Sequence, residues 1–412
     1  MPSRRIFLKN SALAMFGAGS VPAWLSRALY AKDAPGERKK ILIAIFQRGA
    51  VDGLNVVVPH GEPNYYALRP GIGLPRPNGS ESSTIDLDGH FGLNPALHSL
   101  KPLWDKKQLA IVEAVGSPDP TRSHFDAQDY MESGTPGRKG TTDGWLNRAI
   151  GIERNPSPLR AVSLSSELPR AMRGKNGALA VNNLNDFQVK EKGAASAFES
   201  MYGGSADRVL NGTARETFDA IKMVQSIQKE RYVPAGGAKY PGGRLGQSLQ
   251  QIARIIKADV GLEVAFTDVD GWDTHVNEVG ARPHEGQLAN LLRDFGDALA
   301  AFSTDMGDRM TDITVVTMSE FGRTVKENGD RGTDHGHANV MFVLGGSVRG
   351  GQVYGEWPGL AHEQLYEGRD LNVTTDFRTV LSELVARQMG NRNLASVFPG
   401  FDGLASRGIL AV

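Results

Sequence analysis

The sequence predicts an α/β fold in which helices cover both faces of a largely parallel central sheet. Short, nearly continuous apolar runs alternate along the chain with longer segments whose apolar residues recur at helical spacing. A continuous apolar run is typical of a strand that is buried on both faces. Strands that alternate with helices usually form a parallel sheet, because each helix returns the chain to the same edge.

Five apolar runs are predicted to be strands of this sheet. The first of them has six apolar residues in succession after a lysine, with no polar residue that could face solvent. The five runs are residues 40–46, 109–115, 262–267, 313–318 and 339–344.

Four segments are predicted to be helices that cover the sheet. The segment 285–306 places leucine and phenylalanine residues at helical spacing, so these side chains are expected to face the core. Residues 59–94 and 234–243 are rich in glycine and proline and are expected to be loops that are too short for a separate domain. We therefore expect residues 38–412 to form one domain. The predicted helices are residues 215–228, 245–258, 285–306 and 375–389.

Residues 1–31 have the order of regions found in a twin-arginine signal peptide. Arg4 and Arg5 are followed by an apolar pair and a lysine, and then by a moderately apolar stretch over residues 11–25. That stretch is too short and too rich in small residues to span a bilayer, and alanines near residues 28 and 31 offer a cleavage point. The segment predicts export of a folded protein to the periplasm or beyond, with the twin-arginine translocation machinery as a partner.

Composition excludes several classes of function. Residues 1–31 hold four basic residues and no acidic one, so the remaining chain has a net charge near −4 instead of 0. A nucleic-acid partner is not expected, because binding one needs a basic face. No later apolar run is long enough for a membrane helix. The chain has no cysteine, so its stability outside the cytoplasm has to come from its core and not from disulfides.

Polar residues gather where the predicted strands end. In sheets of this kind, ligands bind beyond the carboxyl ends of the strands. Carboxylates and imidazoles follow three of the runs and precede a fourth, so they are expected to meet at one edge. These segments are residues 48–53, 268–275, 319–324 and 332–337.

Two of these segments have the residue types of a metal site. Asp273 and His275 are two residues apart, as are His335 and His337, so each pair faces one side of an extended backbone. Mixed carboxylate and imidazole ligands suit zinc, manganese or iron better than calcium or copper. Each piece taken alone also fits a hydrogen-bonded loop or a turn. Their joint occurrence favours a metal site, to which Asp334 also belongs.

A candidate nucleophile follows the run that ends at residue 115. Ser123 is well placed as the N-cap of a helix, where a hydroxyl lies in a positive local field. Next to a metal ion such a hydroxyl can be deprotonated and attack phosphorus or sulfur. The structural alternative is that Ser123 only caps the helix.

Together these segments resemble the DUF1501 family, which is similar to the alkaline phosphatase and sulfatase superfamily. The resemblance covers essentially the whole chain after the signal segment, and its motifs occur in the family's order. The motifs are Arg-Gly-x-x-Asp-Gly at 48–53, Arg-Ser-His-Phe at 122–125, Gly-Trp-Asp-Thr-His at 271–275, Ser-Glu-Phe-Gly-Arg at 319–323, and Asp-His-x-His at 334–337 with Gly-Gly after the next strand.

The resemblance implies an alkaline-phosphatase-like fold and a set of roles. Asp52 matches the superfamily's first-strand metal ligand, and Asp273 with His275 matches its ligand pair. Glu320 lies in the segment that resembles Ser-Asp-His-Gly, and the late histidine ligand matches His335 or His337. The expected catalytic group comprises a nucleophile, which is Ser123, Thr121 or water, with His124 beside it and three candidate oxyanion clamps, Arg48, Arg122 and Arg323.

Two departures from the superfamily narrow this expectation. Phe321 stands where the superfamily has a ligand histidine, so either one or two ions are expected. The segment 117–122 is one residue too long for the sulfatase motif and the chain has no cysteine, which argues against a formylglycine sulfatase.

The expected function is therefore metal-dependent hydrolysis of a small or polymeric phosphate or sulfate ester, with zinc or manganese as cofactor. One alternative is a catalytically decayed binding or assembly protein of the cell envelope. The other is a mutase or transferase that moves the ester group.

Overall fold

The computed structural model describes residues 38–151, 156–184, 219–229, 231–403 and 407–411. The predicted signal segment lies outside the described residues, as do the first four residues of the predicted helix 215–228. Residues 219–228 of that helix are helical. Among the described residues, no helix is both long enough and apolar enough to cross a membrane.

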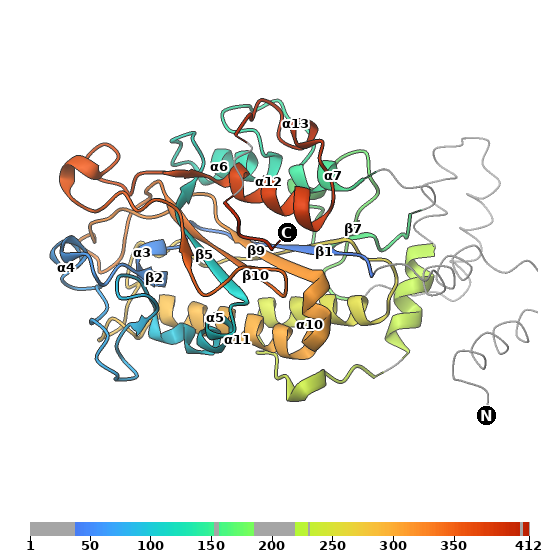
Figure 1. The fold of residues 1–412 in the computed structure, drawn as a ribbon, viewed down its shortest axis with the longest axis horizontal. Coiled ribbons are helices and arrows are strands. Elements are labelled where there is room, and N and C mark those ends of the chain that lie inside the picture. Colours follow the sequence, from blue (N-terminus) through green and yellow to red (C-terminus); the bar gives the residue numbers. More distant parts are fainter. Residues whose placement is uncertain (1–37, 152–155, 185–218, 230, 404–406, 412) are drawn as a thin grey trace, which may run out of the picture.

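A nine-stranded sheet forms the centre of the described structure (Figure 1). Its strands are β1 (Ile41–Gln47), β5 (Leu109–Gly116), β6 (Ala161–Leu164), β7 (Leu179–Ala180), β8 (Val264–Val269), β9 (Ile313–Met318), β10 (Asn339–Gly345), β11 (Val353–Tyr354) and β12 (Thr375–Asp376). Their order is β11-β5-β10-β9-β1-β8-β6-β7, with β12 beside β5. Strand β10 is antiparallel to both β5 and β9, whereas the other pairs are parallel. All five predicted strands are present and the sheet is largely parallel, as expected.

The apolar runs form strands because both faces of the sheet are covered. In β1, Ile43 and Ile45 pack into one core cluster, while Leu42 and Phe46 pack into a second cluster on the opposite face. Each of these four side chains is fully buried. Burying one large aliphatic or aromatic side chain stabilises the fold by roughly 1.5–3 kcal/mol, which outweighs the weak intrinsic preferences of so short a segment.

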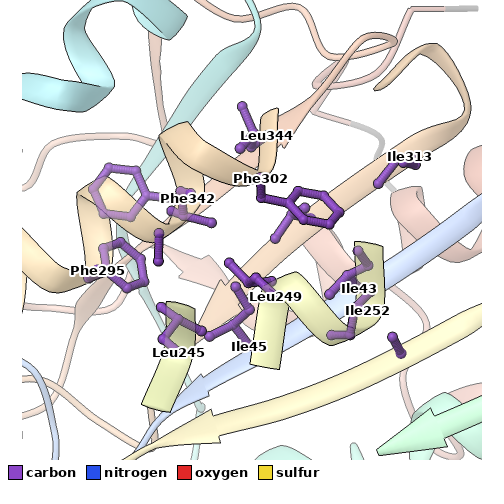
Figure 2. Packing of buried hydrophobic residues seen from close by; sticks show 14 of the residues in the cluster. Ile43, Ile45, Leu245, Leu249, Ile252, Phe295, Phe302, Ile313, Phe342 and Leu344 are labelled. Carbon is purple, nitrogen blue, oxygen red and sulfur yellow. The ribbon is translucent and has the colours of Figure 1, made fainter. Parts of the chain in front are cut away.

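Helices α10 (Arg244–Lys257) and α11 (Gln287–Met306) cover one face of the sheet (Figure 1). Their apolar residues recur at helical spacing and meet the isoleucines of β1 in the first core cluster, as Figure 2 shows for Leu249 and Phe302. The opposite face carries α6 (His124–Ser133), α7 (Trp145–Ala149), α12 (Phe377–Gln388) and α13 (Leu394–Val397).

The predicted loop region 59–94 is mostly irregular but contains short elements. Strands β3 (Ile85–Asp86) and β4 (Gly92–Leu93) lie in this region and form a three-stranded sheet with β2 (Val57–Val58), which precedes it, in the order β2-β4-β3. The elements from this part of the chain and the remaining short helices are α3 (Gly53–Val56), β2 (Val57–Val58), α4 (Pro63–Leu68), β3 (Ile85–Asp86), β4 (Gly92–Leu93), α5 (Lys101–Asp105), and the 3₁₀ helices η1 (Pro95–Leu100), η2 (Arg170–Met172), η4 (Ala235–Gly237), η5 (Gly307–Asp312) and η6 (His362–Gln364).

The topology brings the carboxyl ends of four strands and the first residue of a fifth strand to the same edge of the central sheet. Because β5 and β9 are both antiparallel to β10, they run in the direction of β1 and β8. The carboxyl ends of β1, β5, β8 and β9 therefore lie at the edge where β10 begins. The loops at this edge carry all the residues that the sequence predicts to be functional.

Candidate metal centre

Three imidazoles and one carboxylate converge at this edge. The Nε2 atom of His335 lies 3.0 Å from Nε2 of His124 and 2.9 Å from Nε2 of His275. Asp273 completes the group, with Oδ1 3.0 Å from Nε2 of His275 and 3.3 Å from Nε2 of His335. Its other oxygen lies 3.5 Å from Nε2 of His124. We call these four residues the histidine cluster.

A second contact fixes the tautomer of each imidazole. Nδ1 of His124 lies 2.8 Å from a carboxylate oxygen of Glu320, and Nδ1 of His275 lies 3.2 Å from Oδ1 of Asp334. Nδ1 of His335 lies 3.0 Å from the carbonyl oxygen of Arg122. These oxygens only accept, so each Nδ1 must carry the proton, and in a neutral ring the Nε2 atom carries a lone pair. Three lone pairs therefore point into the histidine cluster.

This arrangement fits a metal ion. Two Nε2 atoms that each carry a lone pair repel one another at 2.9–3.0 Å unless a proton or a cation lies between them. Zinc binds imidazole nitrogen and carboxylate oxygen at about 2.0–2.2 Å, which puts tetrahedral ligands on the order of 3.3 Å apart. His124, Asp273 and His335 are the one such group in the described residues, with ligand atoms all within 4.8 Å of one another. His275 lies beside them, with its Nε2 atom 2.9 Å from Nε2 of His335 and 3.0 Å from Oδ1 of Asp273.

Arg323 holds Asp273 in its ionised form. Its side chain is buried, and Nη2 donates to Oδ1 of Asp273 at 2.6 Å while other guanidinium nitrogens donate to backbone carbonyls. Burial alone would raise the pKa of Asp273, but the hydrogen bond and the charge of Arg323 hold that pKa below its ordinary value. The carboxylate is therefore available to a cation. Arg323 was predicted to be an oxyanion clamp, and in the structure its guanidinium is occupied by Asp273 and by backbone carbonyls.

Glu320 is a buried partner of the cluster and not a member of it. One oxygen accepts from Nδ1 of His124, from Gln128 at 2.9 Å and from the backbone N–H of Gly49 at 2.8 Å. Burial alone would raise the pKa of Glu320, but the hydrogen bonds from His124 and Gln128 lower it. The same contact is the main cause of the raised pKa of His124. Carboxylates of this kind orient metal-ligating histidines in many proteins.

The backbone conformation of residue 49 and its closeness to the Asp273 loop explain why this residue, just after β1, is a glycine. Its φ of +116° is a conformation that residues with a side chain rarely adopt. A Cβ atom at this position would lie 2.6 Å from the backbone nitrogen of Asp273. The turn after β1 can therefore press against the loop that carries Asp273 only if residue 49 is a glycine.

Asp52 was expected to be a metal ligand, but the structure places it apart from the histidine cluster. Both of its oxygens accept from the guanidinium of Arg69, and the pair is buried. Glu278 lies beside the pair, and burial followed by the charge of Asp52 raises the pKa of Glu278 well above its ordinary value. A buried carboxylate needs a partner, and Arg69 supplies it in place of a metal ion.

The late histidine ligand was expected to be His335 or His337, and the structure places His335 in the histidine cluster and His337 outside it. The Nε2 atom of His337 lies 3.1 Å from the carbonyl oxygen of Ser117, and its ring packs against Tyr366. Burial lowers the pKa of His337. The two histidines are two residues apart, but β10 begins at Asn339, and the backbone before that strand is not regularly extended. Asp334 contacts the cluster only through Nδ1 of His275.

The predicted nucleophile region, residues 121–123, directly precedes the cluster residue His124 in the sequence. Ser123 is the N-cap of α6, and its hydroxyl accepts from the backbone of Asp126 at a long 3.5 Å. Thr121 accepts from the backbone of Ser123 at 3.3 Å. Ser123 therefore caps the helix as expected, and the next residue, His124, enters the cluster.

The other two predicted arginine clamps also form ion pairs. Arg122 donates to Asp370 at 2.6 Å and to Glu367 at 2.8 Å. Arg48 donates to Asp268 at 2.7 Å and to Glu132 at 2.9 Å, with 18% of its side chain exposed. Arg48 lies at the wall of an open cleft, so it can still meet a bound molecule.

That cleft has a volume of about 440 Å³, and its link to the histidine cluster runs through the partner residue Glu320. Gln128 and Arg48 line it, and Gln128 also donates to the oxygen of Glu320 that contacts His124. The complete lining is Arg48, Phe125, Gln128, Asp129, Glu132, Ser165, Ser166, Glu167, Leu168, Pro169, Arg170, Arg173, Arg244, Asp268 and Asp270.

Three relevant residues were not singled out by the sequence. Glu278 and Arg69 have no motif around them, and their pairing with Asp52 depends on long-range packing. Gln128 lies one helical turn after His124, so it shares a helix face with that residue, which is a signal that the sequence does contain.

Two solved structures are similar to the chain at low sequence identity. A sulfatase from a Pseudoalteromonas species is 12% identical with a TM-score of 0.39, over 95% of this chain and 77% of the sulfatase chain. The lipoteichoic acid synthase LtaP from Listeria monocytogenes is 10% identical with a TM-score of 0.30, over 82% of this chain and 71% of the LtaP chain.

No curated protein matches the chain in sequence. The model of the family described as "Protein of unknown function (DUF1501)" matches residues 104–397, which include all four residues of the histidine cluster. The expected resemblance is thereby confirmed, and the chain belongs to the DUF1501 family.

Proposed function

We propose that the protein is an exported, metal-dependent hydrolase of phosphate or sulfate esters. The observation that supports this most is the convergence of three Nε2 atoms and the Asp273 carboxylate. A divalent ion held there, zinc or manganese, would act as a Lewis acid that offsets negative charge on the ester group. The residue types fit this ion, because imidazole and carboxylate are ligands that both metals accept.

We propose one ion and not two. Asp52 is neutralised by Arg69, and the carboxylate of Glu320 is used by His124, Gln128 and Gly49. The ring of Phe321 packs 4.9 Å from His124 and 5.1 Å from His335, which fills one side of the cluster with an apolar group. These contacts leave His124, Asp273 and His335 as ligands, with His275 as a fourth.

The residues around the ion would position both the ligands and the substrate. Glu320, Asp334 and the carbonyl of Arg122 orient the three imidazoles, and Arg323 keeps Asp273 ionised. Ser123 precedes His124 at the N-terminus of α6, where the helix dipole favours a developing anion. Ser123, Thr121 or water is the proposed nucleophile, and Arg48 is the proposed contact to the ester from the cleft side.

Export through the twin-arginine pathway belongs to the same proposal. Arg4 and Arg5 with the apolar stretch behind them support it, as does the absence of cysteine from the chain. A protein that folds and takes up its metal before export would keep the metal it meets in the cytoplasm. Replacing both arginines by lysine should then retain a folded, metal-loaded precursor in the cytoplasm, detected by fractionation.

The experiment that tests the enzyme is a combined metal and activity assay. Purified protein is analysed for zinc, manganese and iron, and then screened against phosphate monoesters, phosphate diesters and sulfate esters. We expect a bound ion and turnover of one ester class, both of which are lost in the Asp273→Ala and His335→Ala double variant. A protein that binds no metal and cleaves none of the esters contradicts the proposal.

A second candidate is a cell-envelope binding or assembly protein in which catalysis has been lost. The packing of Phe321 against two cluster histidines favours it, since an apolar ring occupies space beside the reacting group. In that case the Asp273→Ala and His335→Ala double variant should complement a deletion strain as well as the wild type does. If the protein acts as an enzyme, the double variant should fail to complement the deletion strain.

A further inference from the structure

The open cleft lined by Arg48, Phe125 and Gln128 is a candidate binding site outside the histidine cluster. Gln128 belongs to its lining and donates at 2.9 Å to the Glu320 oxygen that also contacts His124. Phe125, which also lines the cleft, is the residue after His124. The cleft is therefore one residue removed from the cluster, through Gln128 and Glu320 on one side and Phe125 on the other. The chemistry of a molecule bound there has to match the lining.

The charge of the lining excludes two classes of ligand. It contains four arginines and five acidic residues, so positive and negative charge nearly balance. A polyanion such as a nucleic acid or a polyphosphate needs an excess of positive charge, which this cleft does not have. Its apolar lining residues are Phe125, Leu168 and Pro169, and Pro169 is buried, so an acyl chain would find little apolar surface. A neutral, strongly hydrogen-bonding ligand remains.

Ion pairs hold most of these charged groups in place. Arg48 contacts Asp268 and Glu132, Arg244 contacts Asp268 at 2.9 Å, and Arg170 contacts Asp129 at 2.6 Å. Paired guanidinium and carboxylate groups are planar and keep further donors and acceptors free. They present a fixed array for hydroxyl groups and need no rearrangement on binding.

Other lining groups remain accessible. Ser166, Glu167, Arg173 and Asp270 are exposed. Within the described part of the chain, no ion pair or side-chain hydrogen bond engages the carboxylates of Glu167 and Asp270. These groups can accept hydrogen bonds from hydroxyls without first breaking a contact.

Phe125 adds an aromatic face to the lining of this polar cleft. It is 90% exposed, the highest value among the large apolar side chains of the described residues. An exposed phenylalanine costs solvation free energy, which the face of a bound ring would recover. Sugars combine such a ring face, made of C–H groups, with a rim of hydroxyls.

We propose that the cleft binds a neutral saccharide, which is the non-reacting part of the ester that the protein cleaves. The role of the saccharide as part of a cleaved ester rests on the proposed hydrolase function, whereas the binding of the saccharide to the cleft does not. The sugar lies with one face on Phe125, and its hydroxyls contact Glu167, Asp270 and the paired guanidinium groups. The ester group then points toward the histidine cluster.

The test measures sugar binding without any ester. The probes are glucose, galactose, mannose, fucose and N-acetylglucosamine, with their β-linked di- and trisaccharides, titrated into the purified protein and followed by ligand-observed NMR and calorimetry. We expect at least one saccharide to bind. The Phe125→Ala variant should weaken it by about tenfold, because both the buried area of the ring and its stacking contact are lost.

Matched variants keep the result interpretable. Phe125→Trp should retain binding, and Val233→Ala should leave it unchanged, because Val233 is 70% exposed but does not line the cleft. The Asp273→Ala and His335→Ala double variant should still bind the sugar, so a failure of the hydrolase proposal is visible separately. The inference is overturned if no saccharide binds at millimolar concentration, if Phe125→Ala binds as well as the wild type, or if adenosine or uridine binds through Phe125 in place of sugars.

Discussion

The Nε2 atoms of His124 and His335 lie 3.0 Å apart, although each ring already donates its Nδ1 proton to another oxygen. Two neutral rings in these tautomers cannot hydrogen-bond to each other through Nε2. The contact is therefore stable only with a cation or an extra proton between the rings. Glu320 and the Arg122 carbonyl create this situation, because they fix both tautomers from outside the cluster.

The first prediction concerns metal binding and stability. Adding zinc or manganese should raise the Tm of metal-free protein, by an amount equivalent to about 2.7 kcal/mol at a hundredfold excess over Kd. His335→Ala should abolish the shift, because it removes a ligand, whereas His98→Ala, at an exposed histidine of η1, should leave it intact. Differential scanning calorimetry measures both. An unchanged shift in His335→Ala would place the metal elsewhere.

Glu320 provides the second prediction. Glu320→Gln keeps the size of the side chain but removes the charge that orients and polarises His124, so metal affinity should fall by about 10–100-fold. Competition with a chromophoric chelator measures the affinity. Glu327→Gln is the control, because Glu327 accepts from Gly71 and Ile72 and contacts no cluster residue. Equal affinities of the two variants would contradict an orienting role for Glu320.

The sequence predicts the strands well and the cluster only in part. Strands β1, β5 and β9 are long apolar runs because they are buried on both faces, and that burial is visible in the sequence. Strand β6 was not predicted, because its four residues, Ala161–Leu164, are too few to show a pattern. The direction of β10 was not predictable either, since an apolar run looks the same in both directions.

The candidate site was likewise predicted in part from the sequence. The segments that supply Asp273, His275 and His335 were predicted from their residue types and their places after or before strands. The sequence could not separate His335 from His337, because the direction of each ring depends on packing against Phe321 and Tyr366. It also could not show that Asp52 is neutralised by Arg69, which comes from a loop 17 residues later.

A third prediction concerns pH. In the metal-free protein, the contact with Glu320 raises the pKa of His124, so this ion pair stabilises the fold below the ordinary value of about 6.5 and is lost as pH rises through the higher folded-state pKa. Metal binding has the opposite dependence, because the ion displaces that proton. The metal-induced rise in Tm should therefore grow between about pH 6 and pH 8. A rise that is independent of pH would argue against histidine ligands.

Glu278 gives a fourth prediction. One of its oxygens accepts from Thr274 at 2.9 Å and from Thr333 at 3.0 Å, so it ties together the two loops that carry Asp273 and His335. Because its raised pKa favours the protonated acid, Glu278→Gln should cost only about 1 kcal/mol of unfolding free energy. Glu278→Ala should cost about 2–4 kcal/mol and also weaken metal binding, because several buried groups lose their partner.

Urea unfolding together with chelator competition separates these effects of Glu278. Full metal affinity in folded Glu278→Ala would show that Glu278 serves stability alone.

Gly49 gives a fifth prediction. Gly49→Ala would place a Cβ atom 2.6 Å from the backbone nitrogen of Asp273, at a φ that alanine rarely adopts. We expect a loss of about 1–3 kcal/mol in unfolding free energy and weaker metal binding, since the loop that carries Asp273 has to move. Gly79→Ala is the control for the unfavourable φ alone, because nothing lies near its Cβ position. Equal metal affinity in both variants would contradict this account of the turn.

The most direct test of the metal centre is a crystal structure with anomalous diffraction measured at the zinc and manganese absorption edges. The account predicts one anomalous peak per chain, about 2.0–2.2 Å from Nε2 of His124, Nε2 of His335 and a carboxylate oxygen of Asp273. A peak at Asp52, a second ion beside Glu320, or no peak in protein crystallised with either metal would contradict it.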